Sequence, residues 1–158
     1  MPKLDLSTAK RRTGSIYPAP YDAEMAGRSS LRLAQLGGLS QFGVNLVRLE
    51  PGAKASLRHW HLREDEFAMI TQGACTLVDD TGRFPMAVGD CAAFPAGEEN
   101  GHHFVNETDQ VMEFLVIGTS FPNEEATYSD VDLKVTMSDH TPVFTRRDGA
   151  PLDGENNG

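Results

Sequence analysis

The fold is decided by two stretches of the chain, GAKASLRHWHLREDEFAMITQG (residues 52–73) and GDCAAFPAGEENGHHFVN (residues 89–106). In the first stretch His59 and His61 are followed by Glu66, and the second stretch contains His102. Neutral imidazoles together with one carboxylate suit a divalent first-row metal that keeps coordination positions open for a ligand. The two stretches therefore predict one metal site.

The spacing of the first two histidines predicts that they share a face of a strand. Side chains alternate between faces, with a rise of about 3.3 Å per residue, so His59 and His61 project to the same side about 6.6 Å apart. Glu66 opens the next apolar run, which returns antiparallel and brings its carboxylate toward the same point. Glu64 is the alternative ligand, but its position in the connection of residues 62–65 makes Glu66 the better candidate.

The rest of the chain has the sequence pattern of an all-β protein. Short apolar runs are separated by Gly, Pro, Asn and Asp, as in a sandwich or barrel of about eight strands. Helical periodicity is weak, and only residues 23–36 are a candidate helix. Asp79-Asp80-Thr81-Gly82 predicts a hairpin turn. We expect strands over residues 41–49, 57–61, 66–72, 74–78, 83–88, 90–95, 102–106 and 111–118.

Composition limits the classes of partner. The 158 residues suit one domain, and a net charge of −9 argues against a nucleic-acid partner, because phosphate backbones are bound by clustered Lys and Arg. The one tight basic run, Lys10-Arg11-Arg12, is interpreted as a solvated terminus. Two cysteines in no chelating spacing fit a reducing compartment, and no segment resembles a signal peptide or a membrane span. A soluble, cytoplasmic protein is expected.

Several residues in the two stretches resemble the paired motifs of the cupin superfamily. They are Gly52, His59, His61, Glu66 and Gly73 in the first stretch, and Gly89, Pro95, Gly97, His102 and Asn106 in the second. The resemblance covers roughly residues 40–120. It implies a double-stranded β-helix, or jelly-roll, barrel with a metal ion inside, held by His59, His61, Glu66 and His102.

One departure from the motif affects the fourth ligand. Four residues, Glu98 to Gly101, stand between Gly97 and the first histidine, where the family pattern has two. The ligand could therefore be His102 or His103. The distance to Asn106 matches His102, and strand alternation sends His103 to the opposite face. His102 is the preferred ligand.

The ligand set is compatible with more than one activity. We expect a small-molecule substrate and one divalent ion, Mn, Fe, Ni or Zn, at the site. The first hypothesis is an isomerase or epimerase of a small sugar-like or hydroxy-carbonyl compound, with the metal as Lewis acid and no base assigned. An Fe(II) dioxygenase and a non-enzymatic ligand-binding cupin are the alternatives.

Some segments resemble bacterial single-domain cupins of the sugar-phosphate-isomerase-like type. These segments are residues 41–46, 58–61, 101–106 and 128–133. A sugar phosphate needs cationic partners. The candidates in the sequence are Arg48, Lys54, Arg63 and Arg83, and they form no evident basic pocket.

The expected organisation is a single cupin domain over residues 15–147, with a barrel core over about 40–120. Residues 1–14 and 148–158 are polar and predicted to be flexible tails. Exposed sheet edges and an apolar face that includes Trp60 predict a homodimer. In that dimer, residues 15–40 or 121–135 would extend the sheet of the partner.

Overall fold

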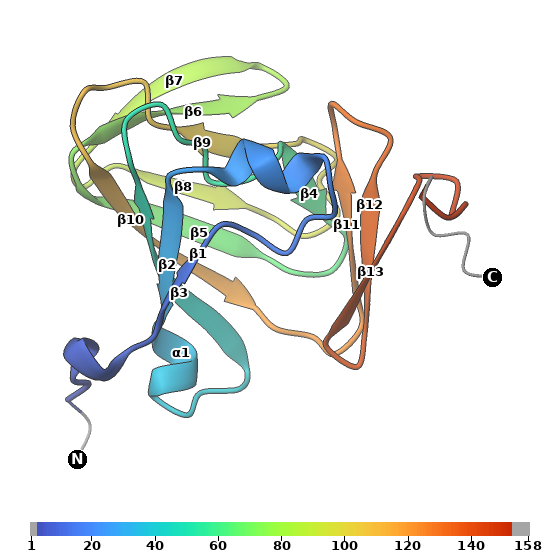
Figure 1. Ribbon diagram of the computed structural model, residues 1–158, viewed down its shortest axis with the longest axis horizontal. Coiled ribbons are helices and arrows are strands. Elements are labelled where there is room, and N and C mark those ends of the chain that lie inside the picture. The colour runs from blue at the N-terminus through green and yellow to red at the C-terminus, as the bar shows by residue number, and fades with distance from the viewer. Residues whose placement is uncertain (1–2, 153–158) are drawn as a thin grey trace.

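The computed structural model describes residues 3–152, which form three antiparallel sheets (Figure 1). The largest sheet has the strand order β1 (Arg11–Thr13), β2 (Arg28–Arg32), β3 (Phe42–Leu49), β10 (Met112–Thr119), β5 (Glu66–Gln72) and β8 (Cys91–Phe94). A four-stranded sheet consists of β13 (Thr141–Thr145), β12 (Lys134–Ser138), β11 (Glu124–Tyr128) and β4 (His59–His61). The third sheet consists of β7 (Gly82–Ala87), β6 (Ala74–Asp79) and β9 (His103–Val105).

The main core lies between the six-stranded sheet and the three-stranded sheet. Val47 pairs with Phe114, and Phe114 pairs with Ile70, so β3, β10 and β5 present one apolar row. This row packs against residues such as Leu77 and Phe104 of the other sheet. A second core joins the four-stranded sheet to the short 3-10 helix Tyr21–Met25. The all-β architecture predicted from the sequence is confirmed.

The predicted strands of the central region are present with ends shifted by one or two residues. The predicted hairpin joins β6 to β7, and the Asp79 carboxylate fixes its turn by accepting from the backbone N–H groups of Thr81, at 2.7 Å, and Gly82, at 3.1 Å. Five strands lie outside the predicted set: β1, β2, β11, β12 and β13.

The predicted helix over residues 23–36 is wrong. This segment contains the end of the 3-10 helix, then β2, and only a four-residue helix α1 (Leu33–Leu36). Gly27 separates the first two elements with a left-handed φ of +78°. Pairing of β2 with β3 on one edge and β1 on the other supplies backbone hydrogen bonds that the weak helical periodicity could not outweigh.

Both predicted tails contain ordered structure. A 3-10 turn spans Leu6–Thr8, and residues 11–13 form the edge strand β1 instead of a loose terminus. At the other end Leu152 packs against the second core, while residues 153–158 lie outside the described residues. Flexibility beyond these elements and the single-domain organisation stay predictions.

The segments proposed to extend a partner's sheet are paired within the chain. Residues 15–40 include β2, and residues 121–135 include β11 and the start of β12. The homodimer itself stays a prediction. None of the helices between residues 3 and 152 is both long and apolar enough to cross a membrane.

Candidate metal centre

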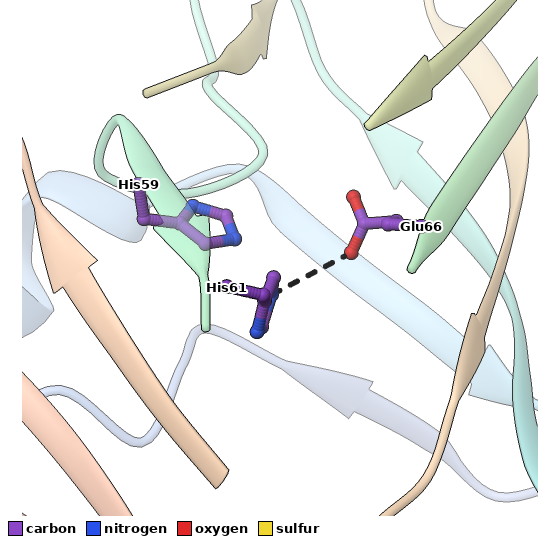
Figure 2. Close-up of side chains that lie close together, drawn as sticks. All are labelled: His59, His61 and Glu66. Carbon is purple, nitrogen blue, oxygen red and sulfur yellow. Dashed lines mark ion pairs between the residues drawn. The ribbon is translucent and has the colours of Figure 1, made fainter. Parts of the chain in front are cut away.

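Four side chains from three neighbouring strand segments come together at the predicted site. His59 and His61 lie on β4, Glu66 is the first residue of β5, and His102 immediately precedes β9. Figure 2 shows the two β4 imidazoles and the carboxylate of Glu66 directed toward a common region. We call His59, His61, Glu66 and His102 the four-residue cluster.

Backbone pairing places two of the imidazoles side by side. The N–H of His59 donates to the carbonyl of His102 at 3.2 Å, and the N–H of His102 donates back at 2.9 Å. This isolated bridge joins the four-stranded sheet to the three-stranded sheet. Side chains of directly opposed residues project to the same face, and the two ring centroids are 5.0 Å apart.

The distances within the cluster are short enough for a shared ion. Potential ligand atoms of His59, His61 and Glu66 all lie within 4.8 Å of one another. The Glu66 carboxylate lies 3.8 Å from Nε2 of His61 and 3.4 Å from Nε2 of His102. Atoms that bind one ion at about 2.1 Å are at most about 4.2 Å apart. The two Glu66 contacts already satisfy this limit.

The ring of His59 is fixed by hydrogen bonds on the side away from a shared ion. Its Nδ1 lies 2.9 Å from the carbonyl of Leu57 and 3.3 Å from the hydroxyl of Ser56. Donation from Nδ1–H to the Leu57 carbonyl leaves Nε2 with a free lone pair. Such backing of a histidine sets the tautomer that binds a metal.

A buried carboxylate lies behind His61. Oε1 of Glu124 is 3.9 Å from Nδ1 of His61. The Glu124 carboxylate also accepts the backbone N–H groups of Leu62, at 2.8 Å, and Arg63, at 3.0 Å. It therefore secures the chain directly after His61, although it lies 58 residues beyond Glu66 in sequence and outside both motif stretches.

The ring of His102 is held by stacking. Phe94 lies parallel to it, with ring centroids 3.4 Å apart and an interplanar angle of 2°. His102 is 2% exposed, and its Nδ1 has no hydrogen-bond partner among residues 3–152. The imidazole is thus positioned by packing, with Nε2 facing Glu66.

The electrostatics of the cluster favour the protonation states that a metal requires. Burial, followed by repulsion from His61 and His102, lowers the pKa of His59 to about 3. Burial alone would raise the pKa of Glu66, but the hydrogen bond from His102 and the three nearby imidazoles outweigh it and lower the pKa to about 2. At neutral pH His59 is therefore neutral and Glu66 ionised, as metal ligands are.

The two alternative ligands are engaged elsewhere. Glu64 accepts the backbone N–H of Phe121 at 2.7 Å. Nδ1 of His103 lies 2.9 Å from the carbonyl of Ser56. The contacts with the Glu66 carboxylate are made by His61 and His102.

The longer loop before His102 is anchored at several points. Asn100 accepts the N–H of Asp80 at 2.9 Å and donates to Asp79 at 3.1 Å. Arg58 donates to the carbonyl of Gly101 at 3.3 Å. A Cβ at Gly101 would lie 1.8 Å from the Ser129 hydroxyl, so only glycine fits between the loop and this residue. The insertion is accommodated without displacing His102 from the cluster.

The cluster borders partly open cavities on two sides. A cavity of about 340 Å³ is lined by His59, Glu66 and His102, and a second cavity of about 350 Å³ is lined by His61 and His102. The first is large enough for a small metabolite. Two tyrosines that sequence reasoning missed, Tyr17 and Tyr128, also line it.

The donor set fits a divalent metal. The imidazoles of His59 and His61 lie close to the Glu66 carboxylate, and Nε2 of His102 lies 3.4 Å from that carboxylate, on a sheet framework beside a cavity. This combination suits Mn, Fe, Co, Ni or Zn and leaves coordination positions open. His59, His61, Glu66 and His102 are the residues that would hold the ion.

Comparison with known proteins places this site in a family. The family model described as Cupin domain matches residues 45–118. The crystal structure of a sugar phosphate isomerase from the cupin superfamily of Silicibacter pomeroyi is 61% identical, covers 98% of each chain and superimposes with a TM-score of 0.94. A comparison with curated proteins found no match.

More distant structures share the fold. The polyketide cyclase RemF from Streptomyces resistomycificus is 23% identical over 75% of this chain and 79% of its own, with a TM-score of 0.59. A protein of Rhodospirillum rubrum with a cupin-2 domain is 16% identical over 93% of this chain and 82% of its own, also with a TM-score of 0.59. With the 61% identity to the Silicibacter pomeroyi protein, these findings show that the chain belongs to the cupin superfamily.

Proposed function

We propose that this protein is a divalent-metal-dependent isomerase or epimerase of a small sugar-like or hydroxy-carbonyl compound. The observation that carries the proposal is the convergence of the four-residue cluster, of which His59, Glu66 and His102 line a cavity of about 340 Å³. The similarity to a sugar phosphate isomerase of Silicibacter pomeroyi supports the reaction class.

A bound divalent ion supplies Lewis acidity toward a carbonyl and hydroxyl of the substrate. The protein's own contribution is a positioned and enclosed site. The ionised Glu66 contributes a negative charge, and the ring of Phe94 holds the imidazole of His102 by stacking.

Two tyrosines contribute hydrogen-bond donors. The rings of Tyr17 and Tyr128 meet edge to face, with centroids 5.3 Å apart, and both line the cavity. Burial raises the pKa of each. The two side chains hydrogen-bond to each other and stay protonated at neutral pH, so the pair orients a substrate oxygen by donating to it and does not remove a proton.

Solvent deuterium exchange tests the reaction directly. Isomerisation or epimerisation through an enolised substrate exchanges the proton next to the carbonyl with solvent. The metal-loaded protein is incubated in D2O with a panel of aldoses, ketoses and their phosphates, and NMR detects deuterium at that carbon. We expect metal-dependent incorporation with at least one compound and none for His59→Ala.

A matched control and a parallel measurement make the outcome decisive. His140 has a φ of +60° on an exposed turn outside both cavities, and Asn tolerates this conformation, so His140→Asn removes a histidine without touching the site. It should exchange as the wild type does. Substrate-dependent oxygen uptake without deuterium incorporation would overturn the proposal in favour of dioxygenase chemistry.

A further inference from the structure

The cavity lined by His59, Glu66 and His102 also has a cationic wall. Arg12, Arg28 and Arg32 line it together with Ser30 and Asn45. The sheet register explains this grouping. Residues 28, 30 and 32 alternate along β2 and share a face, while Arg12 on β1 lies directly opposite Ser30. We call Arg12, Arg28 and Arg32 the arginine cluster.

The charges of the arginine cluster are not neutralised by any acidic side chain of the described residues. Within residues 3–152, the ion pairs of the chain involve other side chains, and no Asp or Glu pairs with these three. Three cations on one wall of a strongly acidic protein form a local positive potential that favours an anion.

Arg28 is held in place for such a role. Its Nε donates to the carbonyl of Ala55 at 2.6 Å, and its Nη1 donates to the carbonyl of Gly14 at 3.0 Å. Burial, and then repulsion from Arg12 and Arg32, lower its pKa, with Tyr17 acting in the opposite sense. An arginine remains charged in spite of such a shift. A preorganised guanidinium of this kind loses little entropy on binding an anion.

The cations that the sequence suggested as phosphate partners are placed differently. Arg48 pairs with Glu50 at 3.2 Å, Lys54 pairs with Glu24, and Arg83 with Glu107 at 2.5 Å. None of these three, nor Arg63, lines the cavity. These four residues form no basic wall in this cavity, and β1 and β2 supply the arginines that line it.

We propose that the arginine cluster is an oxyanion subsite that binds the phosphate or carboxylate group of the substrate. This inference rests on the proposed function for the identity of the ligand, an anionic hydroxy-carbonyl compound whose other end reaches the four-residue cluster. Guanidinium groups bind both oxyanions by charge-assisted, bidentate hydrogen bonds. The arginine cluster thus selects the charged end of the substrate.

Titration calorimetry with inorganic phosphate at low ionic strength tests the subsite. The full chain is measured with and without bound metal, so that coordination of phosphate to the ion is separated from binding by arginine. Arg12→Gln should weaken phosphate binding roughly tenfold in both states, and the double variant Arg12→Gln/Arg32→Gln should weaken it further.

Arg11→Gln is the matched control. Arg11 is adjacent on β1, donates to Ser29 at 3.1 Å and does not line the cavity. The substitution Arg11→Gln removes the same charge from the same strand and should leave phosphate affinity within about twofold of the wild type. Arg28 also supports the fold through Ala55 and Gly14, so the test does not depend on its removal.

Acetate serves as the second probe and separates the two sources of oxyanion. Arginine-dependent binding of phosphate assigns a phosphorylated substrate, and arginine-dependent binding of acetate alone assigns a carboxylate. Equal weakening by Arg11→Gln and Arg12→Gln, or no arginine-dependent binding of either probe, would overturn the subsite. These measurements need no turnover, so the subsite can stand if isomerase activity fails, and it can fail if isomerase activity is found.

Discussion

Two walls of the same cavity differ in how they are built. The four-residue cluster comes from residues 59–102, inside the region matched by the family model. The arginine cluster comes from residues 12–32, on strands added to the edge of the large sheet. The first wall is suited to bind a metal and the second an anion. In the proposed function, the chemistry of the reaction and the recognition of the substrate are carried by separate parts of the chain.

The largest expected effect comes from removing one ligand of the four-residue cluster. His59→Ala should reduce metal affinity by more than the roughly 10- to 100-fold typical of losing an outer-shell residue, because it removes a direct ligand. Phosphate binding by the arginine cluster should persist. Elemental analysis after dialysis and calorimetry with phosphate measure the two properties separately. Loss of both, in a variant with wild-type circular dichroism, would show that the walls are one unit.

Glu124→Gln tests whether Glu124 supports metal binding by the four-residue cluster. The substitution keeps the shape but removes the negative charge that lies 3.9 Å from Nδ1 of His61 and weakens the hydrogen bonds from the backbone N–H groups of Leu62 and Arg63. We expect metal affinity to fall about 10-fold. Glu125→Gln is the control, since Glu125 pairs instead with Lys134 at 3.2 Å. Equal affinities for the wild type and Glu124→Gln would remove the proposed role of Glu124.

Gly101→Ala tests the loop that delivers His102. The new Cβ would overlap the Ser129 side chain, which should lower the free energy of unfolding by about 1–3 kcal/mol and also weaken metal binding. Gly43→Ala is the control because its Cβ would meet no atom closer than 3.9 Å. Thermal unfolding with and without metal measures both effects. A variant as stable as Gly43→Ala would contradict the described packing.

The smallest expected effect is a pH dependence of stability, and it involves residues outside the four-residue cluster and the arginine cluster. The hydrogen bond from Arg58 lowers the pKa of Asp130 below its usual 3.8. Because the unfolded chain then takes up the proton first, this contribution to stability is present above about pH 3.8 and is lost as pH falls through the folded-state value. Asp130→Asn should cost less than about 1 kcal/mol at pH 7. The difference in melting temperature from the wild type should shrink below pH 4, whereas a constant difference would exclude this linkage.

The four-residue cluster could be predicted from the sequence because local spacing defines it. Alternation along β4 places His59 and His61 on one face, and the following turn returns Glu66 to them. The position of β9 also follows from the motif around His102. These relations extend over a few residues, or over a recognisable pair of motifs, and survive without knowledge of the rest of the fold.

The arginine cluster could not be predicted from local spacing. The sequence predicts Arg12 in a solvated terminus and residues 23–36 as a helix, whereas their conformation depends on the pairing of β1 with β2 and of β2 with β3. Glu124 was missed for the same reason, since β11 brings it to Leu62 across 62 residues. Long-range strand register, which no local pattern encodes, decides these positions.

Anomalous X-ray scattering from crystals of the metal-loaded protein, collected on both sides of the absorption edge of the ion, tests the central claim most directly. We predict one strong peak about 2.1 Å from Nε2 of His59, with the imidazoles of His61 and His102 and the carboxylate of Glu66 completing the coordination. A metal-loaded crystal with no peak among these four side chains, or with its peak bound by other residues, would contradict the account.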